Sequence, residues 1–225
     1  MIRIKHLLTI PIIATTIACS NTNGYKSYEE YPSFQGEWTE MSYSPQSTSF
    51  MVWAPTAEAV KVNLFDEGID SDVVSSVDMK KADNGKWEAE IKEDLNGKFY
   101  TFNVRINGKW LGDTPGVMAK AVGVNGKRAA IINLDSTDPE GWENDKRPEL
   151  KSFNDIILYE MHHRDFSVDS LSGIKNGGKF IALTEVGTKN SYGQSTGIDH
   201  LKELGITHVH ILPSYDYASV DETKL

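Results

Sequence analysis

Two histidines separated by a single residue, His208 and His210, form the clearest pair of chemically active side chains in this sequence. They belong to the apolar run ITHVHIL, which is typical of a buried strand. Side chains two positions apart on a strand share a face, so the two imidazoles could begin the metal site of a metal-dependent hydrolase. Such a site needs further histidine or carboxylate ligands, which we expect this chain to lack. We therefore favour packing of both rings beside the strand, and we predict no metal and no other cofactor. His162 and His163 are weaker candidates, because neighbouring residues on a strand face opposite ways.

Five further polar and aromatic residues lie at or just beyond the carboxyl ends of two predicted strands, 155–166 and 206–212. In parallel α/β domains the chemistry gathers at these ends, where aromatic rings can stack on sugars and carboxylates can bind hydroxyls. The candidates for substrate binding are Arg164, Asp165, Tyr215, Asp216 and Tyr217. For the first two, a structural ion pair that anchors the following loop is the favoured alternative. For the other three, a packed turn after Pro213 is an equal alternative.

The elements around these residues predict part of a parallel α/β domain. Ser195 or Thr196 can cap a helix whose apolar residues recur at helical spacing, and Gly205 can end it in a left-handed turn. With the strand 155–166 before it and the strand 206–212 after it, the order is strand, long loop, helix, strand. Two such strands are expected to lie parallel and to be joined by a right-handed crossover.

Residues 31–134 follow a different pattern, in which apolar and polar residues alternate along short segments. Segments 60–64, 87–91 and 100–106 each alternate in the way that half-buried strands do. Asn-Gly pairs punctuate the region, and the pair at 107–108 is placed as a two-residue hairpin turn. Short strands with such turns predict an antiparallel, immunoglobulin-like β-sandwich over residues 32–135.

Three tryptophans of this region are expected to differ in role. Trp53 and Trp87 lie within alternating segments and are predicted to belong to the core. Trp110 lies next to the predicted hairpin tip and is therefore the better candidate for an exposed aromatic ring that binds substrate.

The first twenty residues, MIRIKHLLTIPIIATTIACS, are typical of an export signal. Two basic residues precede an apolar stretch too short to span a bilayer, and a small residue precedes the only cysteine. This resembles a bacterial lipoprotein signal, residues 1–18, cleaved before Cys19, which would carry the lipid. An ordinary secretory signal is the alternative. We expect an exported protein anchored by lipid to the bacterial cell envelope, in the periplasm or at the outer-membrane surface, with residues 19–31 as a tether.

The charge of the chain excludes one class of partner. The formal net charge is -9, and no cluster of lysine and arginine interrupts this acidity. We therefore expect no binding of nucleic acid. The negative charge does not disfavour the binding of a neutral partner such as a carbohydrate. With a single cysteine, no disulfide can form within the chain.

Four segments of the sequence, in this order, resemble known enzymes. STSFMVWAPTAEAVKVNLF resembles the opening of the family 48 carbohydrate-binding module that precedes the catalytic barrel in glycogen- and starch-debranching enzymes. AKAVGVNGKRAAIINLDSTDPEGW is similar to the end of that module in type I pullulanases. IILYEMHHRDFS is similar to their first barrel strand, and STGIDHLKELGITHVHILPSYDYASVDE to their first helix and second strand. From about residue 50 onward, the chain therefore resembles an N-terminal fragment of a type I pullulanase.

The resemblance implies a family 13 glycoside hydrolase that cleaves α-1,6 branch linkages in pullulan, amylopectin or limit dextrins. That family uses a retaining mechanism with an aspartate nucleophile and a glutamate acid–base, which come from later barrel strands. Residues 151–225 would supply only the first two strands of an incomplete (β/α)8 TIM barrel, after a linker at 136–150. We therefore assign no catalytic residue to this chain and expect it to be inactive by itself, so its status as an enzyme stays open.

A second hypothesis is a stand-alone α-glucan-binding lipoprotein, in which the sandwich binds the glucan and the barrel segment is vestigial. Both hypotheses predict the same partners. These are an α-glucan, such as pullulan, amylopectin or limit dextrin, and a membrane engaged only through the lipid on Cys19.

Overall fold

The computed structural model describes residues 24–215 and 219–224, and the chain divides into two compact units. The sandwich unit comprises Met1–Thr137 with Glu222–Leu225, and the parallel unit comprises Asp138–Asp221. Within the described residues, no helix combines the length and the apolar character that crossing a membrane requires.

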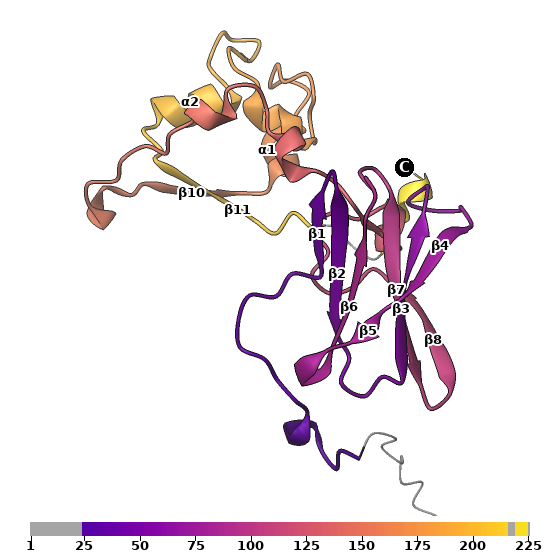
Figure 1. The fold of residues 1–225 in the computed structure, drawn as a ribbon. Coiled ribbons are helices and arrows are strands. Elements are labelled where there is room, and N and C mark those ends of the chain that lie inside the picture. Colours follow the sequence, from indigo (N-terminus) through magenta and orange to yellow (C-terminus); the bar gives the residue numbers. More distant parts are fainter. Residues whose placement is uncertain (1–23, 216–218, 225) are drawn as a thin grey trace, which may run out of the picture. The chain divides into compact units, whose positions relative to one another are not determined.

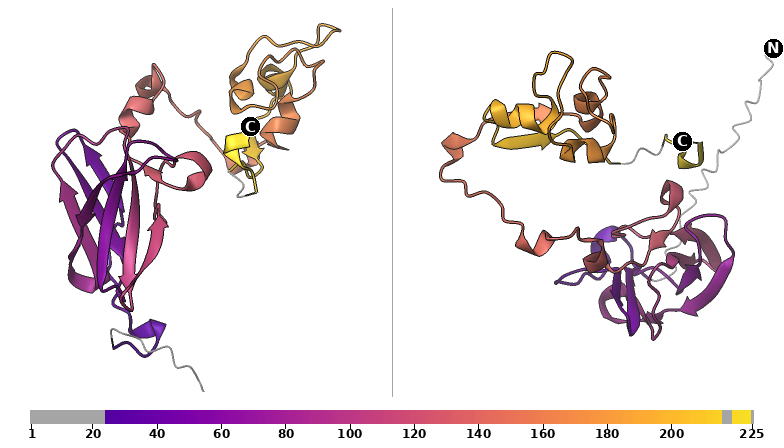
Figure 2. Two further views of the ribbon diagram at one scale, coloured as in Figure 1. Left: turned by 90° about the vertical axis from the view of Figure 1, so that its right-hand side faces the viewer. Right: turned by 90° about the horizontal axis from the view of Figure 1, so that it is seen from above.

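Two antiparallel sheets form the sandwich unit, as predicted (Figure 1). One sheet has four strands in the order β1-β2-β6-β5, and the other has five, β4-β3-β7-β8 with β9 beside β7. Figure 2 shows the same two sheets from two other sides. The strands are β1 (Met41–Ser44), β2 (Ser47–Trp53), β3 (Ala59–Phe65), β4 (Val73–Asp78), β5 (Lys80–Lys81), β6 (Lys86–Ile91), β7 (Phe99–Ile106), β8 (Lys109–Thr114) and β9 (Ala129–Ala130).

The core lies between these sheets, where the apolar members of each alternating strand meet. Phe50 of β2 packs edge to face on Tyr100 and Phe102 of β7, with ring centroids 5.1 and 6.4 Å away. Val62 of β3 and Trp87 of β6 are buried with them. The prediction that Trp87 belongs to the core is therefore confirmed.

The prediction that Trp53 belongs to the core is wrong. Its indole is only half-buried, and its Nε1 donates hydrogen bonds to Pro32 O at 3.0 Å and to Asn84 O at 3.1 Å. Tyr31 lies against the indole, with ring centroids 6.3 Å apart. Trp53 thus holds an N-terminal segment on the sandwich. Tyr31 is the last residue of the predicted tether, residues 19–31.

The predicted two-residue turn connects β7 and β8. Asn107 and Gly108 both have positive φ, 53° and 70°, which an Asn-Gly pair adopts readily in a tight hairpin. The amide of Gly108 also donates to the Glu58 carboxylate, at 3.0 Å from Oε2. Local sequence chemistry is therefore sufficient to specify this hairpin.

One carboxylate is buried within the sandwich unit. Glu40 is 1% exposed and accepts hydrogen bonds from the amides of Val117, at 3.2 Å, and Met118, at 2.8 Å. Burial, and then the nearby Glu40 charge, raise the pKa of the Tyr100 hydroxyl above its ordinary value. Glu40 thus ties the segment after β8 to the core.

The parallel unit contains one pair of parallel strands, β10 (Leu158–Met161) and β11 (His208–Ile211), in register from Leu158↔His208 to Met161↔Ile211. The predicted parallel pairing is confirmed. The predicted strand 155–166 is too long, however. The observed strand β10 begins only after a 3-10 turn and ends before a helix that starts at His163. The helices of this unit are α1 (His163–Ser167) and α2 (Gly197–Glu203), with 3-10 turns at Phe153–Asp155 and Phe180–Thr184.

The helix predicted before the second strand is confirmed as α2. Thr196 occupies its N-cap, and Gly205 follows it with a φ of 75°, the left-handed conformation expected after a helix end. The prediction that the strands are buried is wrong for all their residues except Met161 of β10, which is 8% exposed. Leu158 and Ile211 are 58% and 44% exposed, because a two-stranded sheet offers few neighbours to cover its faces.

Candidate functional site

Trp110 lies on the solvent-facing side of the five-stranded sheet, and a bulge in β8 places it there. Arg105 of β7 pairs with Trp110 and Asn103 pairs with Asp113, so β8 has two residues where β7 has one. Gly112 occupies the bulge with a φ of 112°, a backbone conformation that favours glycine. The bulge turns Trp110 and Asp113 toward the same face although they are three positions apart.

Two cations hold the Trp110 indole in place and leave part of its surface free. Lys61 Nζ lies 4.7 Å and Arg105 Cζ lies 5.8 Å from the ring centroid, distances typical of cation–π contacts. Arg105 is itself paired with Glu58, Nε to Oε2 at 3.4 Å. The tryptophan remains 36% exposed. A fixed, partly exposed aromatic ring is suited to stacking on the apolar face of a ligand.

A row of hydrogen-bonded polar side chains lies beside the ring and crosses four strands. Asp113 Oδ1 accepts from Asn63 Nδ2 at 3.0 Å and from Asn103 Nδ2 at 2.8 Å. Ser76 Oγ donates to Asn63 Oδ1 at 2.7 Å. Amide and carboxylate groups offer both donors and acceptors to hydroxyl groups. We call Trp110 and this row, together with Lys61 and Arg105, the Trp110 face.

Only Trp110 of this face was among the predicted site residues. Its partners come from β3, β4, β7 and β8 and lie on the face of the sheet away from the core, although Asn63 is only 4% exposed. Polar residues at such positions are common on any solvent-exposed sheet face, so the sequence pattern did not distinguish them. The signal that could have found them is their position opposite Trp110, which requires the strand register.

The predicted pair Arg164 and Asp165 lies in α1. Their side chains are exposed and contact each other, Nη1 to Oδ1 at 3.7 Å. The loop that follows is held by Ser167 instead, whose Oγ accepts from the Gly178 amide at 2.8 Å. Asp165 also lines a surface hollow of about 980 Å³ together with Tyr159. The two residues thus form an exposed ion pair before the loop, and their contact with a ligand stays a prediction.

Other predicted residues belong to the parallel unit or fall outside the described residues. Tyr215 is 73% exposed in the parallel unit. Asp216, Tyr217 and Cys19 fall outside the described residues, so their predicted roles stay predictions.

The histidines of the parallel unit make pairwise contacts. His210 Nδ1 lies 3.1 Å from Glu160 Oε2 on the neighbouring strand. Within the described residues, no three metal-binding side chains gather in one place. The expectation that His162 and His163 face opposite ways is wrong, because both lie beyond the end of β10 and their rings stack at 4.6 Å.

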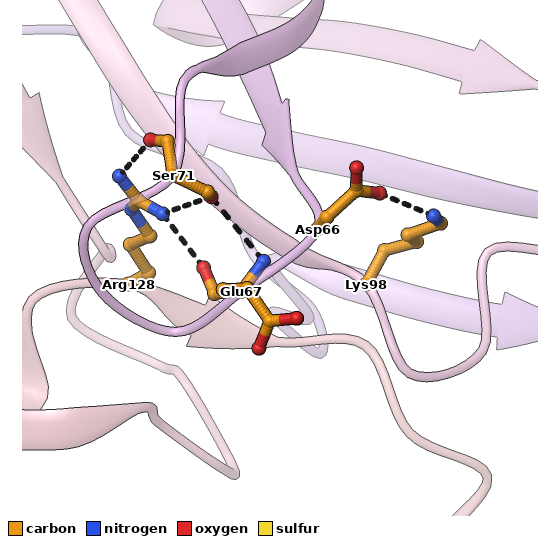
Figure 3. Close-up of polar contacts among 5 residues, drawn as sticks. All are labelled: Asp66, Glu67, Ser71, Lys98 and Arg128. Atoms are coloured by element: carbon orange, nitrogen blue, oxygen red, sulfur yellow. Dashed lines mark hydrogen bonds and ion pairs between the residues drawn. The ribbon is translucent and has the colours of Figure 1, made fainter.

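A second polar cluster of the sandwich unit has a structural role (Figure 3). Arg128 donates to Glu67 O at 2.7 Å and to both Oγ and O of Ser71, at 2.8 and 2.7 Å. Its guanidinium also lies 3.7 Å from the centroid of the Phe65 ring. Lys98 pairs with Asp66 at the start of the same loop. These groups bind one another and fix the β3–β4 loop.

Known proteins related to this chain share its sandwich. Residues 36–119 match the family model described as carbohydrate-binding module 48 (isoamylase N-terminal domain). The chain is 37% identical over 185 residues to a pullulanase of Bacillus subtilis (strain 168), an alignment that covers 81% of this chain and 24% of that protein. It is 34% identical over 201 residues to chloroplastic pullulanase 1 of Arabidopsis thaliana, covering 81% of this chain and 19% of that protein.

Solved structures agree with the sequence matches. The apo pullulanase from Paenibacillus barengoltzii is 45% identical, with a TM-score of 0.80 over 85% of this chain and 29% of that chain. The chain thus spans about a quarter of the length of the relatives it matches. The predicted resemblance is confirmed. Most of the chain is therefore similar to an N-terminal fragment of known pullulanases, and its residues 36–119 match a family 48 carbohydrate-binding module.

Proposed function

We propose that this chain is the N-terminal part of an α-1,6-glucan debranching glycoside hydrolase, and that its sandwich binds α-glucan through the Trp110 face. The observation that carries the proposal is the Trp110 indole, fixed by Lys61 and Arg105 beside a hydrogen-bonded polar row. A neutral polyhydroxylated ligand suits such a face, because the ring can stack on a sugar while amides and a carboxylate bind its hydroxyls.

Solved relatives support α-glucan as the ligand class. The Paenibacillus barengoltzii pullulanase has been crystallised in complex with maltohexaose and α-cyclodextrin, and it is 45% identical to this chain with a TM-score of 0.81. Its D470A variant was crystallised with maltotetraose. These complexes describe that protein, and they make α-glucans the natural ligands to test on this chain.

Affinity electrophoresis in gels that contain amylopectin tests the proposal. We expect amylopectin to retard the purified chain and Trp110→Ala to weaken this binding by about tenfold or more, because truncation removes a central aromatic contact. Trp142→Ala is the matched control, since Trp142 is 55% exposed and lies away from the Trp110 face in sequence. Migration of the unsubstituted chain without retardation would count against the proposal.

The parallel unit is, in this proposal, the start of a (β/α)8 barrel. The parallel ladder of β10 and β11, with α2 before the second strand, is the repeat of such a barrel. Arg164, Asp165 and residues 215–217 then lie at or beyond the carboxyl ends of the strands, where they contact the glucan.

We expect residues 1–225 alone to release no reducing sugar from pullulan. The resemblance places the nucleophile and the acid–base on later barrel strands, which the two strands of this chain do not provide. Measurable hydrolysis by the purified chain would overturn this expectation. Binding without hydrolysis is compatible with the second candidate, a stand-alone α-glucan-binding lipoprotein, because the whole Trp110 face lies within the sandwich.

Lipid on Cys19 is the proposed link to the cell envelope. The basic start, the short apolar stretch and the small residue before the single cysteine support it. Cys19→Ala should release the protein from membranes during high-salt and carbonate washes, as followed by immunoblotting of the fractions. Retention of the variant on the membrane would contradict the proposal.

A further inference from the structure

Four aromatic residues form a cluster where the N-terminal segment meets the sandwich. Tyr25 and Tyr28 each pack edge to face on Tyr31, with ring centroids 5.2 and 5.3 Å away. Tyr31 in turn packs on Trp53 at the end of β2, 6.3 Å between centroids. We call these four residues the N-terminal aromatic cluster. None of them belongs to the Trp110 face or to the buried core cluster.

Hydrogen bonds hold the cluster in one arrangement. The Trp53 indole donates to Pro32 O, which fixes the chain next to Tyr31. The Tyr31 amide donates to Tyr28 O at 3.1 Å and so closes the 3-10 turn Tyr28–Glu30. The Lys26 amide donates to Glu30 Oε2 at 2.8 Å across the same turn. A ligand that binds here meets rings that are already ordered, which lowers the entropic cost of binding.

The outermost ring of the cluster is largely free. Tyr28 is 72% exposed, whereas Tyr31 beneath it is half-buried. Exposed carboxylates of Glu29 and Glu30 flank it in the turn. Hydrogen bonding from Ser27 lowers the pKa of the Glu29 carboxyl, which favours its ionised, hydrogen-bond-accepting form. These charges repel an anionic lipid surface or a nucleic acid, whereas sugar hydroxyls can donate to them.

Trp53 of the cluster ends β2, and the loop after it contacts the turn between β7 and β8, where the Gly108 amide donates to Glu58 Oε2 at 3.0 Å. Trp110 is the second residue of β8 after that turn. Two aromatic surfaces are therefore presented at one end of one rigid domain. A glucan that contacts both surfaces must be long enough to join them, so a polysaccharide is the ligand to compare with a short oligosaccharide.

We propose that the N-terminal aromatic cluster is a second α-glucan contact, in which Tyr28 stacks on a sugar of a glucan chain that also occupies the Trp110 face. This inference rests on the proposed function of that face. Linked contacts raise the affinity for a long ligand because the second contact forms intramolecularly. Tyr28 therefore contributes to the binding of polysaccharide and leaves the binding of short oligosaccharide unchanged.

The test compares amylopectin with maltotriose as ligands of the purified chain. Tyr28→Ala should weaken amylopectin binding by about tenfold, while maltotriose binding remains as in the unsubstituted chain. Tyr28→Phe keeps the ring and should retain amylopectin binding. Phe153→Ala is the matched control, since Phe153 is 84% exposed and lies in the parallel unit. Unchanged melting temperatures show that every variant is folded.

The possible outcomes separate this inference from the proposed function. If Trp110→Ala loses amylopectin binding and Tyr28→Ala does not, the second contact is refuted and the Trp110 face stands. If the unsubstituted chain binds neither ligand, both proposals fail. Tyr28-dependent binding to phosphatidylglycerol vesicles, with amylopectin binding unaffected, would assign the cluster to a membrane surface and overturn the inference.

Discussion

In the sandwich unit, the apolar side chains of β3 and β7 are covered by a second sheet, whereas most of those of β10 and β11 in the parallel unit face solvent. Val62 and Phe102 are 0% exposed, but Leu158 and Ile211 are 58% and 44% exposed. All four residues lie in short strands of similar apolar character. The difference in exposure arises because each sheet of the sandwich packs on the other, and the side chains of a sheet are buried only by elements that pack on its faces.

The same comparison separates the two sets of candidate contacts. Each partner of Trp110 is fixed by a neighbouring strand, so the face is preorganised. Arg164 and Asp165 are exposed residues on a short helix, and Tyr215 is an exposed residue after a strand. The side chains of the Trp110 face are therefore held more rigidly than the candidate residues of the parallel unit.

The largest expected effect is on the sandwich core. Phe102→Ala should lower the free energy of unfolding of the sandwich by about 3–5 kcal/mol, because it leaves a cavity among closely packed rings. Chemical denaturation followed by tryptophan fluorescence measures this loss. Phe102→Leu, which keeps most of the volume, should cost less. Equal losses for the two variants would contradict a tightly packed core.

Alkaline pH should reveal the burial of Tyr100. Its pKa is raised in the folded state, so the unfolded state loses the tyrosine proton first as the pH rises. The stabilisation is therefore fully present below about pH 10 and is lost above it, by at most about 1.4 kcal/mol per pH unit. The free energy of unfolding of Tyr100→Phe should fall less steeply over the same range. Parallel pH profiles for the two proteins would be inconsistent with a buried hydroxyl.

The bulge that orients the Trp110 face can be tested at Gly112. Gly112→Ala should cost on the order of 1 kcal/mol of stability, because alanine is strained at a φ of 112° although no atom lies near its added methyl group. It should also weaken amylopectin binding by turning Trp110 or Asp113 away from the face. Gly97→Ala has a similar positive φ and open surroundings, and it serves as the control that should leave binding intact.

The smallest effect is expected at the exposed face of β10. Leu158→Ala should change the free energy of unfolding of the parallel unit by no more than about 0.5 kcal/mol, because little buried surface is lost. Hydrogen exchange of the β10 and β11 amides measures this change. A loss close to that of Phe102→Ala would show that the face of β10 is covered in solution, and it would remove the contrast between the two units.

Sequence periodicity and turn chemistry identified three strands of the sandwich, the Asn-Gly hairpin and α2, because these features depend on residues close together in the chain. The parallel pairing of β10 with β11 was predicted from the order strand, loop, helix, strand. The bounds of the strands were predicted less accurately. The strand predicted over 155–166 is shortened because a 3-10 turn and a helix occupy its two ends.

The sequence by itself determined the fold of the sandwich and the family resemblance, and it predicted that Trp110 is an exposed aromatic residue. Only the tertiary structure decided which side chains surround that ring, because Asn63 and Asp113 are 50 residues apart and meet through strand register and a bulge. It also decided that Trp53 binds the N-terminal segment and does not enter the core, since alternation assigns a side chain to a face but not to its neighbours.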